Sequence, residues 1–420
     1  MTRRHVMNFR WVILAATLGA GASAQADWPD FRGPSGQGIA TGRLPTDWGP
    51  DKNIAWKRPI PGHGWSSPVV AKGTIFLTTS ILSGEKAAKT LSLRVLALEA
   101  ATGKTLWDEE VFRPEGKHIV NIHAKNSHAS PTPIVDGDRI LVHFGHHGSA
   151  ALDWTGKTLW KNNEFTYNPT HGNGGTPALV DSLVVFSADG NATQDLIALN
   201  RETGAIVWKT PRNVKSSLKF AFSTPLIIDV QKEKQIISSG PGFAAAYDPK
   251  SGAEIWRANF GNGWSTVPRP VFGQGLVYLT THYVEPRLYA IRPDGRGDVT
   301  KTHVAWTLSK GAPQIASPLL VGDELYVVAN NGLASCLDAK TGSIHWQQRI
   351  EGEHTSSPIV ADGKIYFVSE NGVCTVVRAS KTFERMSQNA MGEKTLASLA
   401  AADGRLYLRT EQNLYKIEEK

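Results

Sequence analysis

The sequence has little cysteine, and beyond its first residues it has no apolar run long enough to cross a membrane. Cys336 and Cys374 are the only two cysteines among 420 residues, which excludes a disulfide-rich scaffold. An exported compartment would permit a bridge between them, but sequence does not show that the sulfurs meet. We expect two buried thiols. No stretch after residue 26 approaches the roughly 18 apolar residues that a membrane-spanning helix needs.

A strong excess of charge is also missing, and so are several catalytic signatures. The formal net charge is +7, and the basic residues are scattered along the chain, which argues against a nucleic-acid partner. No nucleophile elbow, phosphate-binding loop or dinucleotide fingerprint occurs in the required strand–helix context.

The first 26 residues have the layout of a secretory signal peptide. Arg3, Arg4 and Arg10 precede or border the short apolar stretch 11–20, and small residues at 22, 24 and 26 provide cleavage sites. We therefore expect export to the periplasm or the cell exterior, and no lipid anchor, because no cysteine lies near the cleavage site. Residues 27–53 form a Gly/Pro-rich approach to the first strand.

Two interleaved repeats organise residues 54–420. A Trp recurs after a Thr/Ser-Gly turn, or in step with it, at spacings of 51, 53, 48, 48, 50 and 40 residues. The series is Trp56, Trp107, Trp160, Trp208, Trp256, Trp306 and Trp346. A second series, of the type SSPVV or STPLI, places a Pro at 68, 133, 177, 225, 270, 318 and 358, with a degenerate ASLAA around Leu399.

These repeats predict an all-β, eight-bladed β-propeller of four-stranded antiparallel blades. Asp-Gly turns separate apolar strands, as in DGDRILVHF and DGKIYFVS, and the unit of about 40–50 residues is the size of a propeller blade. The last unit has only three strands. Residues 54–60, which have no blade of their own, supply its outer strand and close the ring. Seven blades stay open as an alternative, because the eighth unit has lost both its Pro and its Trp.

The TG-x-x-x-W turn, the SSP-type strand and the count of eight resemble the PQQ-like repeat. Quinoprotein alcohol dehydrogenases and BamB-like proteins share that repeat, and the resemblance covers about residues 54–420. It implies the blade and says little about activity. BamB-like proteins serve outer-membrane protein assembly and are usually lipid-anchored, whereas this chain has no cysteine for an anchor. The quinoproteins imply pyrroloquinoline quinone (PQQ) and calcium in the channel mouth.

The loops that lead into the innermost strand of each blade, here called the inlet loops, surround that mouth and are the default ligand site. The candidate ligand-binding residues are His63, Trp65, Asn126, His128, His171, Asn173, Trp264, His354 and Lys394. The loop between Trp107 and Pro133 is the longest. Tight turns alone would also make these loops polar and glycine-rich.

Seven of the thirteen histidines lie between residues 118 and 171. Their spacing matches no zinc signature, and His143 belongs to a strand that should be buried, so we expect no metal site. We also expect no catalytic residue. Neither the adjacent cysteines of quinoproteins nor a spaced cluster of acids is present.

The favoured function is therefore an exported, non-catalytic scaffold with a protein partner or a small ligand, such as a sugar, at one face, and without a cofactor. The alternative is a PQQ-dependent oxidoreductase with an atypical site.

Overall fold

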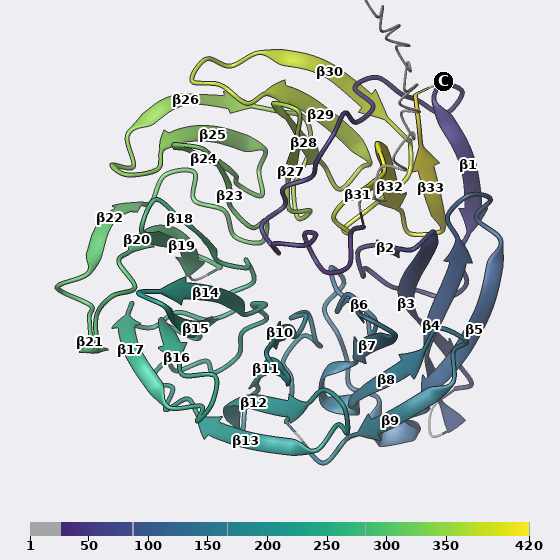
Figure 1. The fold of residues 1–420 in the computed structure, drawn as a ribbon, viewed down its shortest axis with the longest axis horizontal. Coiled ribbons are helices and arrows are strands. Elements are labelled where there is room, and N and C mark those ends of the chain that lie inside the picture. The colour runs from purple at the N-terminus through teal and green to yellow at the C-terminus, as the bar shows by residue number, and fades with distance from the viewer. Residues whose placement is uncertain (1–26, 86–87, 166, 282, 420) are drawn as a thin grey trace, which may run out of the picture.

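The computed structural model describes residues 27–85, 88–165, 167–281 and 283–419, and its eight sheets are arranged in a ring (Figure 1). The predicted signal peptide lies outside the described residues. Among the described helices, none has the length and apolar character that would carry it across a bilayer.

Each blade runs from an innermost strand beside the channel to an outermost strand on the rim. Blade 1 contains β2 (Val69–Ala71), β3 (Thr74–Ser83), β4 (Thr90–Glu99) and β5 (Thr105–Phe112); blade 2 contains β6 (Ile134–Asp136), β7 (Arg139–His143), β8 (Ser149–Asp153) and β9 (Thr158–Asn162). Blade 3 contains β10 (Ala178–Val180), β11 (Leu183–Asp189), β12 (Gln194–Asn200) and β13 (Ile206–Pro211); blade 4 contains β14 (Leu226–Val230), β15 (Glu233–Gly240), β16 (Phe243–Tyr247) and β17 (Glu254–Asn259).

The second half of the ring repeats this plan. Blade 5 contains β18 (Val271–Gly273), β19 (Leu276–Thr281), β20 (Arg287–Ile291) and β22 (Val304–Leu308); blade 6 contains β23 (Leu319–Val321), β24 (Glu324–Val328), β25 (Leu333–Asp338) and β26 (Ile344–Arg349). Blade 7 contains β27 (Ile359–Ala361), β28 (Lys364–Val368), β29 (Val373–Arg378) and β30 (Arg385–Ala390). The short β21 (Gly297–Asp298) pairs in parallel with β17. The 3-10 turn η2 (Gly116–His118) lies between blades 1 and 2, and η3 (Gly145–His147) joins β7 to β8 within blade 2.

Blade 8 closes the ring as the sequence predicts. Its strands β31 (Ala400–Ala402), β32 (Arg405–Arg409) and β33 (Asn413–Ile417) are joined by the N-terminal strand β1 (Ile54–Pro59), which pairs antiparallel with β33. The first and last strands of the propeller therefore share one sheet, and each hides an edge of the other. The eight-blade prediction is confirmed, and the seven-blade alternative is wrong.

The repeating Trp packs each blade against the next. The indole of Trp160, for example, donates from Nε1 to the carbonyl of Arg201, at 3.0 Å, in the turn of the following blade. The turn glycine, Gly204, has a φ of +74°, and a Cβ there would lie 2.4 Å from that indole. The glycine is thus required both for its backbone conformation and for the close approach of the ring. The Trp56, Trp107, Trp208, Trp306 and Trp346 indoles donate to the following blade in the same way.

Two repeat positions depart from this rule. Trp256 donates instead to Gln235 of its own blade, where the following blade carries the β21 insertion. The expectation that the eighth unit lacks a Trp is wrong, because Trp56 belongs to that unit through β1. The blade without a Trp is the seventh, in which Ser387 occupies the position opposite Val376.

The approach segment supplies the aromatic side chain that blade 7 lacks. Trp48 is buried and stacks on Tyr366 of blade 7, with 6.3 Å between ring centroids. Its backbone N–H donates to Asn389, and both Asn389 and Ser387 donate to the carbonyl of Thr46. Residues 44–48 therefore belong to the fold of blade 7 and are not a loose leader.

The approach segment also crosses the channel, and we call residues 28–40 the plug. In Figure 1 this purple stretch crosses the middle of the ring. Trp28 exchanges backbone hydrogen bonds with Val70 of blade 1, and Val360 of blade 7 bonds to the backbone on either side of Ile39. Both partners lie in innermost strands, so the plug spans the channel from one blade to another.

Arg269 of blade 5 fixes the plug between these two points. Its guanidinium is 3.5 Å from the Asp30 carboxylate and donates at 2.8 Å to the carbonyl of Phe31. Gln37 of the plug accepts the backbone N–H of Phe272 in the same blade.

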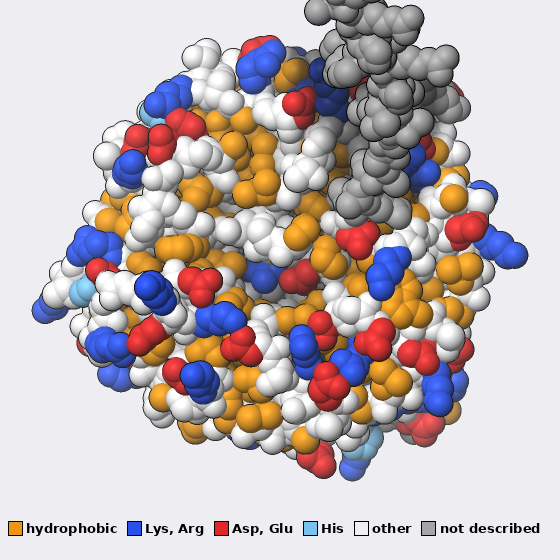
Figure 2. Space-filling view, in the orientation of Figure 1, with side chains coloured by type: hydrophobic (Ala, Val, Ile, Leu, Met, Phe, Trp, Pro, Cys, Tyr) orange, Lys and Arg blue, Asp and Glu red, His pale blue; other side chains and the backbone are white. Residues whose placement is uncertain are grey.

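The two cysteines are buried and unbridged, as expected. Burial also raises the pKa of Cys336 to about 11, so its thiol is unreactive at neutral pH. The face seen in Figure 2 carries Lys/Arg and Asp/Glu side chains interspersed, with hydrophobic patches between them.

Candidate functional site

A cavity of about 280 Å³ lies at the mouth of the channel, where the chain enters the innermost strands. Inlet-loop residues of several blades form its wall, and Phe31 of the plug also lines it. The lining residues are Phe31, Trp65, Ser67, His123, Lys125, Asn126, Ser130, Thr132, His171, Gly174, Thr176, Phe220, Phe222, Thr224, Trp264, Ser265, Val267, Tyr283, Ile315, Ser317, Thr355, Ser357, Leu396 and Ser398.

A ring of hydroxyl groups forms the inner wall. Seven blades place Ser or Thr directly before the repeat Pro or its equivalent: Ser67, Thr132, Thr176, Thr224, Ser317, Ser357 and Ser398. At six blade junctions the residue in this position donates its backbone N–H to the hydroxyl of the next blade, as Thr132 does to Thr176 at 3.0 Å. Neighbouring blades are thereby held in register around the channel.

Blade 5 is the exception to the hydroxyl ring. It has Arg269 in this position, and that side chain holds the plug.

Aromatic side chains form the outer wall. Trp65 is 6% exposed, Trp264 is half-buried, and Phe220 and Phe222 are 5.9 Å apart between ring centroids. The His171 ring meets Phe220 edge-on at 5.3 Å, and burial lowers the pKa of His171, so the imidazole is held neutral at neutral pH. Flat apolar surfaces and a hydroxyl ring thus face the same space.

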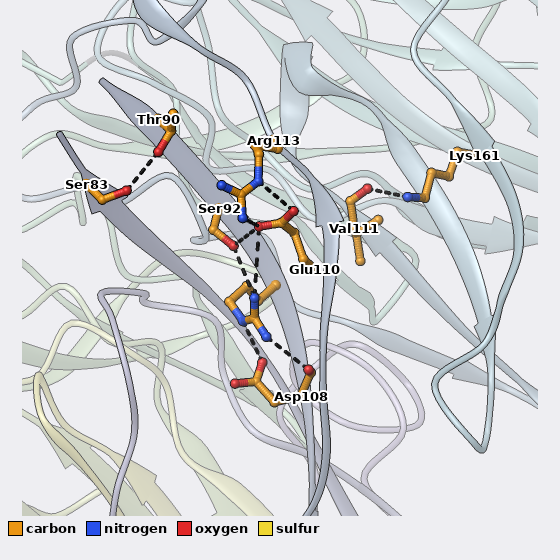
Figure 3. A network of polar contacts seen from close by, with 9 residues as sticks. Ser83, Thr90, Ser92, Asp108, Glu110, Val111, Arg113 and Lys161 are labelled. Atoms are coloured by element: carbon orange, nitrogen blue, oxygen red, sulfur yellow. Dashed lines mark hydrogen bonds and ion pairs between the residues drawn. The ribbon is translucent and has the colours of Figure 1, made fainter. Parts of the chain in front are cut away.

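The long inlet loop of blade 2 crosses the mouth, and we call residues 113–130 the strap. Its root is tied to blade 1 by Arg113, which donates to Glu110 at 2.8 Å, beside Ser92 on the same carboxylate (Figure 3). The extended hairpin of β3 and β4 supports the root further, through hydrogen bonds between residues 89–91 and 114–116.

The strap ends its crossing in blade 7. Lys125 Nζ lies 2.7 Å from Glu353 and 2.8 Å from Glu370. Burial lowers the pKa of the Lys125 ammonium, but the hydrogen bonds to the two carboxylates outweigh this effect and raise it. Asn126 donates to the His171 carbonyl in blade 3 at 2.8 Å. The strap therefore joins blades 1, 3 and 7 over one side of the cavity.

Four of the predicted residues, Trp65, Asn126, His171 and Trp264, line this cavity. Five lie elsewhere: His63, His128, Asn173, His354 and Lys394. The ring of His63 contacts Trp65 edge-on at 5.1 Å, behind the cavity wall. His354 is fully buried, and Lys394 is exposed. These two side chains have opposite surroundings, although both belong to inlet loops.

Asn173 and His128 belong to a histidine cluster in blade 2. Asn173 contacts His146 at 2.9 Å, and His146 lies 3.8 Å from His147 between ring centroids. Burial lowers the pKa of His147 to about 3 and that of His128 to about 4. No group of three or more His, Cys, Asp or Glu with metal-binding geometry occurs in the part of the chain that the structure describes.

Four features of the site were missed in the sequence. Lys125 and Thr355 line the cavity, and Phe31 reaches it from the plug. The hydroxyl ring had a visible signal, because Ser or Thr precedes the Pro in the SSP, PTP, GTP, STP and ASP motifs. Phe31 had none, since a segment before the first blade gave no indication that it enters the channel.

The family is shown by a match over most of the chain. The family model described as "Outer membrane protein assembly factor BamB" matches residues 66–210, 240–332 and 297–384. The chain belongs to the PQQ-like, BamB-type propeller family. Among solved structures, BamB from Moraxella catarrhalis has a TM-score of 0.60 at 13% identity, covering 87% of this chain and 99% of that one. At this identity the likeness shows the fold alone.

Quinoproteins are also similar to this member of the BamB-type family. Methanol dehydrogenase [cytochrome c] subunit 1 from Methylorubrum extorquens is 32% identical over 160 residues, which cover 32% of this chain and 24% of the relative. The match thus spans about a quarter of that curated relative. The quinohemoprotein alcohol dehydrogenase from Comamonas testosteroni has a TM-score of 0.54 at 14% identity, covering 94% of this chain and 81% of that one.

The cavity of this BamB-type propeller does not fit a calcium–quinone pair. Calcium takes six to eight oxygen ligands, commonly with carboxylates among them. Among the described residues that line the cavity there is no Asp or Glu. Lys125 is paired with two carboxylates, so it offers no free cation to an acidic quinone. The hydroxyl oxygens of the ring already accept backbone N–H groups.

Proposed function

We propose that this protein is an exported, non-catalytic binding propeller that takes a small ligand into the cavity at the channel mouth. The observation that carries the proposal is the lining: Trp65, Phe220, Phe222 and Trp264 meet a ring of hydroxyl groups in one concave space. Small-molecule sites are typically concave and mostly apolar, with a few converging polar groups, in cavities of roughly 300–1,000 Å³. The cavity, at about 280 Å³, lies just below that range and suits a small ligand.

A ligand-observed NMR screen tests the binding role. The mature protein and a Trp65→Ala/Trp264→Ala variant would be screened against fragments that include aromatic compounds, saccharides and short peptides. We expect a set of fragments to bind the wild-type protein and to lose binding in the variant, since both aromatic walls are gone. Fragments that bind both proteins equally, or no binding fragment at all, would refute the cavity as the site.

Outer-membrane protein assembly is one setting for such a scaffold, and the family description favours it. The test is complementation of a deletion strain, followed by measurement of outer-membrane protein levels. If assembly is the role and a side surface carries it, the Trp65→Ala/Trp264→Ala variant should complement fully. Failure of the wild-type gene to change these levels would remove assembly from the proposal.

A PQQ-dependent oxidoreductase is the second candidate, favoured by the identity with methanol dehydrogenase. Titration of the mature protein with PQQ and calcium, followed by tryptophan fluorescence, separates it from the first. Tight, saturable binding would move the quinoprotein candidate ahead of a non-catalytic role. The lack of carboxylates in the described lining leads us to expect no saturation at high micromolar cofactor.

A further inference from the structure

Two polar groups of the cavity wall are buried without a hydrogen-bond partner. Trp65 is 6% exposed and Thr355 is 8% exposed, and both line the cavity. The Trp65 Nε1–H and the Thr355 hydroxyl have no partner among the residues that the structure describes. A buried donor without an acceptor is costly, so these two groups mark where a ligand would gain hydrogen bonds.

The hydroxyl ring adds further donors. The oxygens of Thr132, Thr176, Thr224 and Ser398 each accept a backbone N–H from a neighbouring blade. Within the described chain, none of these four hydroxyls donates to another protein group, so each O–H is left to donate into the channel. The one amide of the wall, Asn126, already accepts from Ser130. The wall therefore holds two donors without an acceptor in the described chain, at Trp65 and Thr355, while its own acceptors include hydroxyl oxygens and the imidazole nitrogens of His123 and His171.

Charge narrows the ligand class. Lys125 is the only Lys or Arg among the described lining residues, and Glu353 and Glu370 both bind it. An anionic ligand would find no free cation. A cationic ligand would find no carboxylate on the described wall and would meet hydroxyl protons instead. An uncharged ligand avoids the free-energy cost of burying a charge that has no partner of opposite sign.

The balance of donors and acceptors also separates aromatic ligands from saccharides. A saccharide brings a donor with almost every acceptor, whereas the unpartnered Trp65 indole can only donate. A carbonyl oxygen only accepts. The flat faces of Trp264 and Phe220 suit a planar ring, which stacks on or meets other rings edge-on.

Resting on the proposed binding role, we propose that the cavity takes an uncharged, planar aromatic molecule with carbonyl oxygens. A carbonyl of this ligand accepts from Trp65 Nε1–H, from Thr355 or from the hydroxyl ring, while Trp264 and Phe220 contact its ring faces. This ligand class differs from an acidic quinone with calcium, which the lining does not fit.

Three matched probes test this by isothermal titration calorimetry on the mature protein. Chromone has a planar bicyclic ring with a carbonyl, naphthalene has the shape without the carbonyl, and chromone-2-carboxylate adds a negative charge. We expect chromone to bind, naphthalene to bind about tenfold more weakly, and the carboxylate to give no measurable binding.

Four single variants locate the hydrogen bonds. Trp65→Phe and Thr355→Val remove the unpartnered donors and should each weaken chromone binding roughly 3- to 10-fold. Trp48→Phe and Thr375→Val are matched controls, because each carries a buried unpartnered donor but lies outside the cavity. We expect the controls to leave the dissociation constant unchanged. A thermal melt of each variant confirms that it is folded.

Each other result overturns part of the inference. Equal binding of chromone and naphthalene, unaffected by Trp65→Phe, refutes the carbonyl contact. Tighter binding of chromone-2-carboxylate refutes the uncharged class. If no probe binds but other fragments bind in a manner that depends on Trp65 and Trp264, the ligand class is wrong and the proposed binding role stands. If no fragment binds at all, both are wrong.

Discussion

Trp48 should contribute as much to stability as a repeat Trp, although it lies outside the repeats. It is buried and stacks on Tyr366 with 6.3 Å between ring centroids, and in the preceding blade Trp346 packs on Tyr326 at 6.1 Å in a tilted arrangement. Truncation of a buried Trp to Ala costs about 3–5 kcal/mol. For a chain of roughly 400 residues, the unfolding entropy is near 0.8 kcal/mol per kelvin, so Trp48→Ala should lower the melting temperature by about 4–6 °C. Trp346→Ala, in blade 6, should have a similar effect.

A second substitution decides whether Trp48 occupies the vacant repeat position. Ser387 pairs with Val376 next to a bulge, as Trp346 pairs with Cys336 next to a bulge. Ser387→Trp in the wild-type protein would crowd Trp48 and should destabilise by about 1–3 kcal/mol. In the Trp48→Ala protein the same substitution should fill the cavity and stabilise.

Urea unfolding and thermal melts of the two single variants and the double variant give the coupling free energy between positions 48 and 387. The reasoning requires that the effect of Ser387→Trp reverse its sign between the two backgrounds. If Ser387→Trp destabilises both backgrounds to the same extent, the two side chains do not compete for one position. The account of Trp48 as a replacement for the repeat Trp would then be wrong.

Three further predictions concern the strap, the plug and blade 2. Lys125→Met should release the strap from blade 7 and speed both association and dissociation of a cavity ligand, measured by stopped-flow fluorescence; unchanged rates would show that the strap does not limit access. Arg269→Met leaves the partly buried Asp30 unpaired and should cost up to about 3 kcal/mol and expose residues 28–40 to limited proteolysis, and Asp30→Asn in the same protein should recover part of this. His143 is 2% exposed, and burial lowers its pKa to about 3, so it stays neutral in the fold but takes a proton near pH 6.5 when unfolded. Above pH 6.5 the ring is neutral in both states and costs the fold nothing. As the pH falls from 6.5 towards 3, the unfolded chain binds a proton at His143 that the folded chain does not, so the free energy of unfolding falls by up to about 1.4 kcal/mol per pH unit. His143→Gln should therefore flatten the acid side of the stability curve.

The fold was predictable because its signals are periodic and local. A Trp or a Ser-Pro pair every 40–53 residues reports one blade at a time, and closure follows from the strand left over at 54–60. The closing strand also carries Trp56 into blade 8, so the blade without a repeat Trp is the seventh and not the eighth.

The site was only partly predictable because its contacts join distant positions. Trp65 and Trp264 stood out as aromatic residues in glycine-rich inlet loops. Lys125 did not, because its carboxylate partners are 228 and 245 residues away. Phe31 likewise depends on the plug, which Arg269 holds from a distance of 238 residues in the sequence. Local patterns show where a loop turns, but not which loops meet across a ring.

The plug and the hydroxyl ring depend on the same residue position, the one directly before the repeat Pro of each blade. Seven blades place Ser or Thr in the ring, and the exception, Arg269, is the residue that fixes the plug. The plug crosses the channel from blade 1 to blade 7, and the strap lies over one side of the cavity at the mouth. The Arg269 backbone still donates to Ser317 of the next blade, so this position joins neighbouring blades as the Ser and Thr residues do, while its side chain also holds the plug.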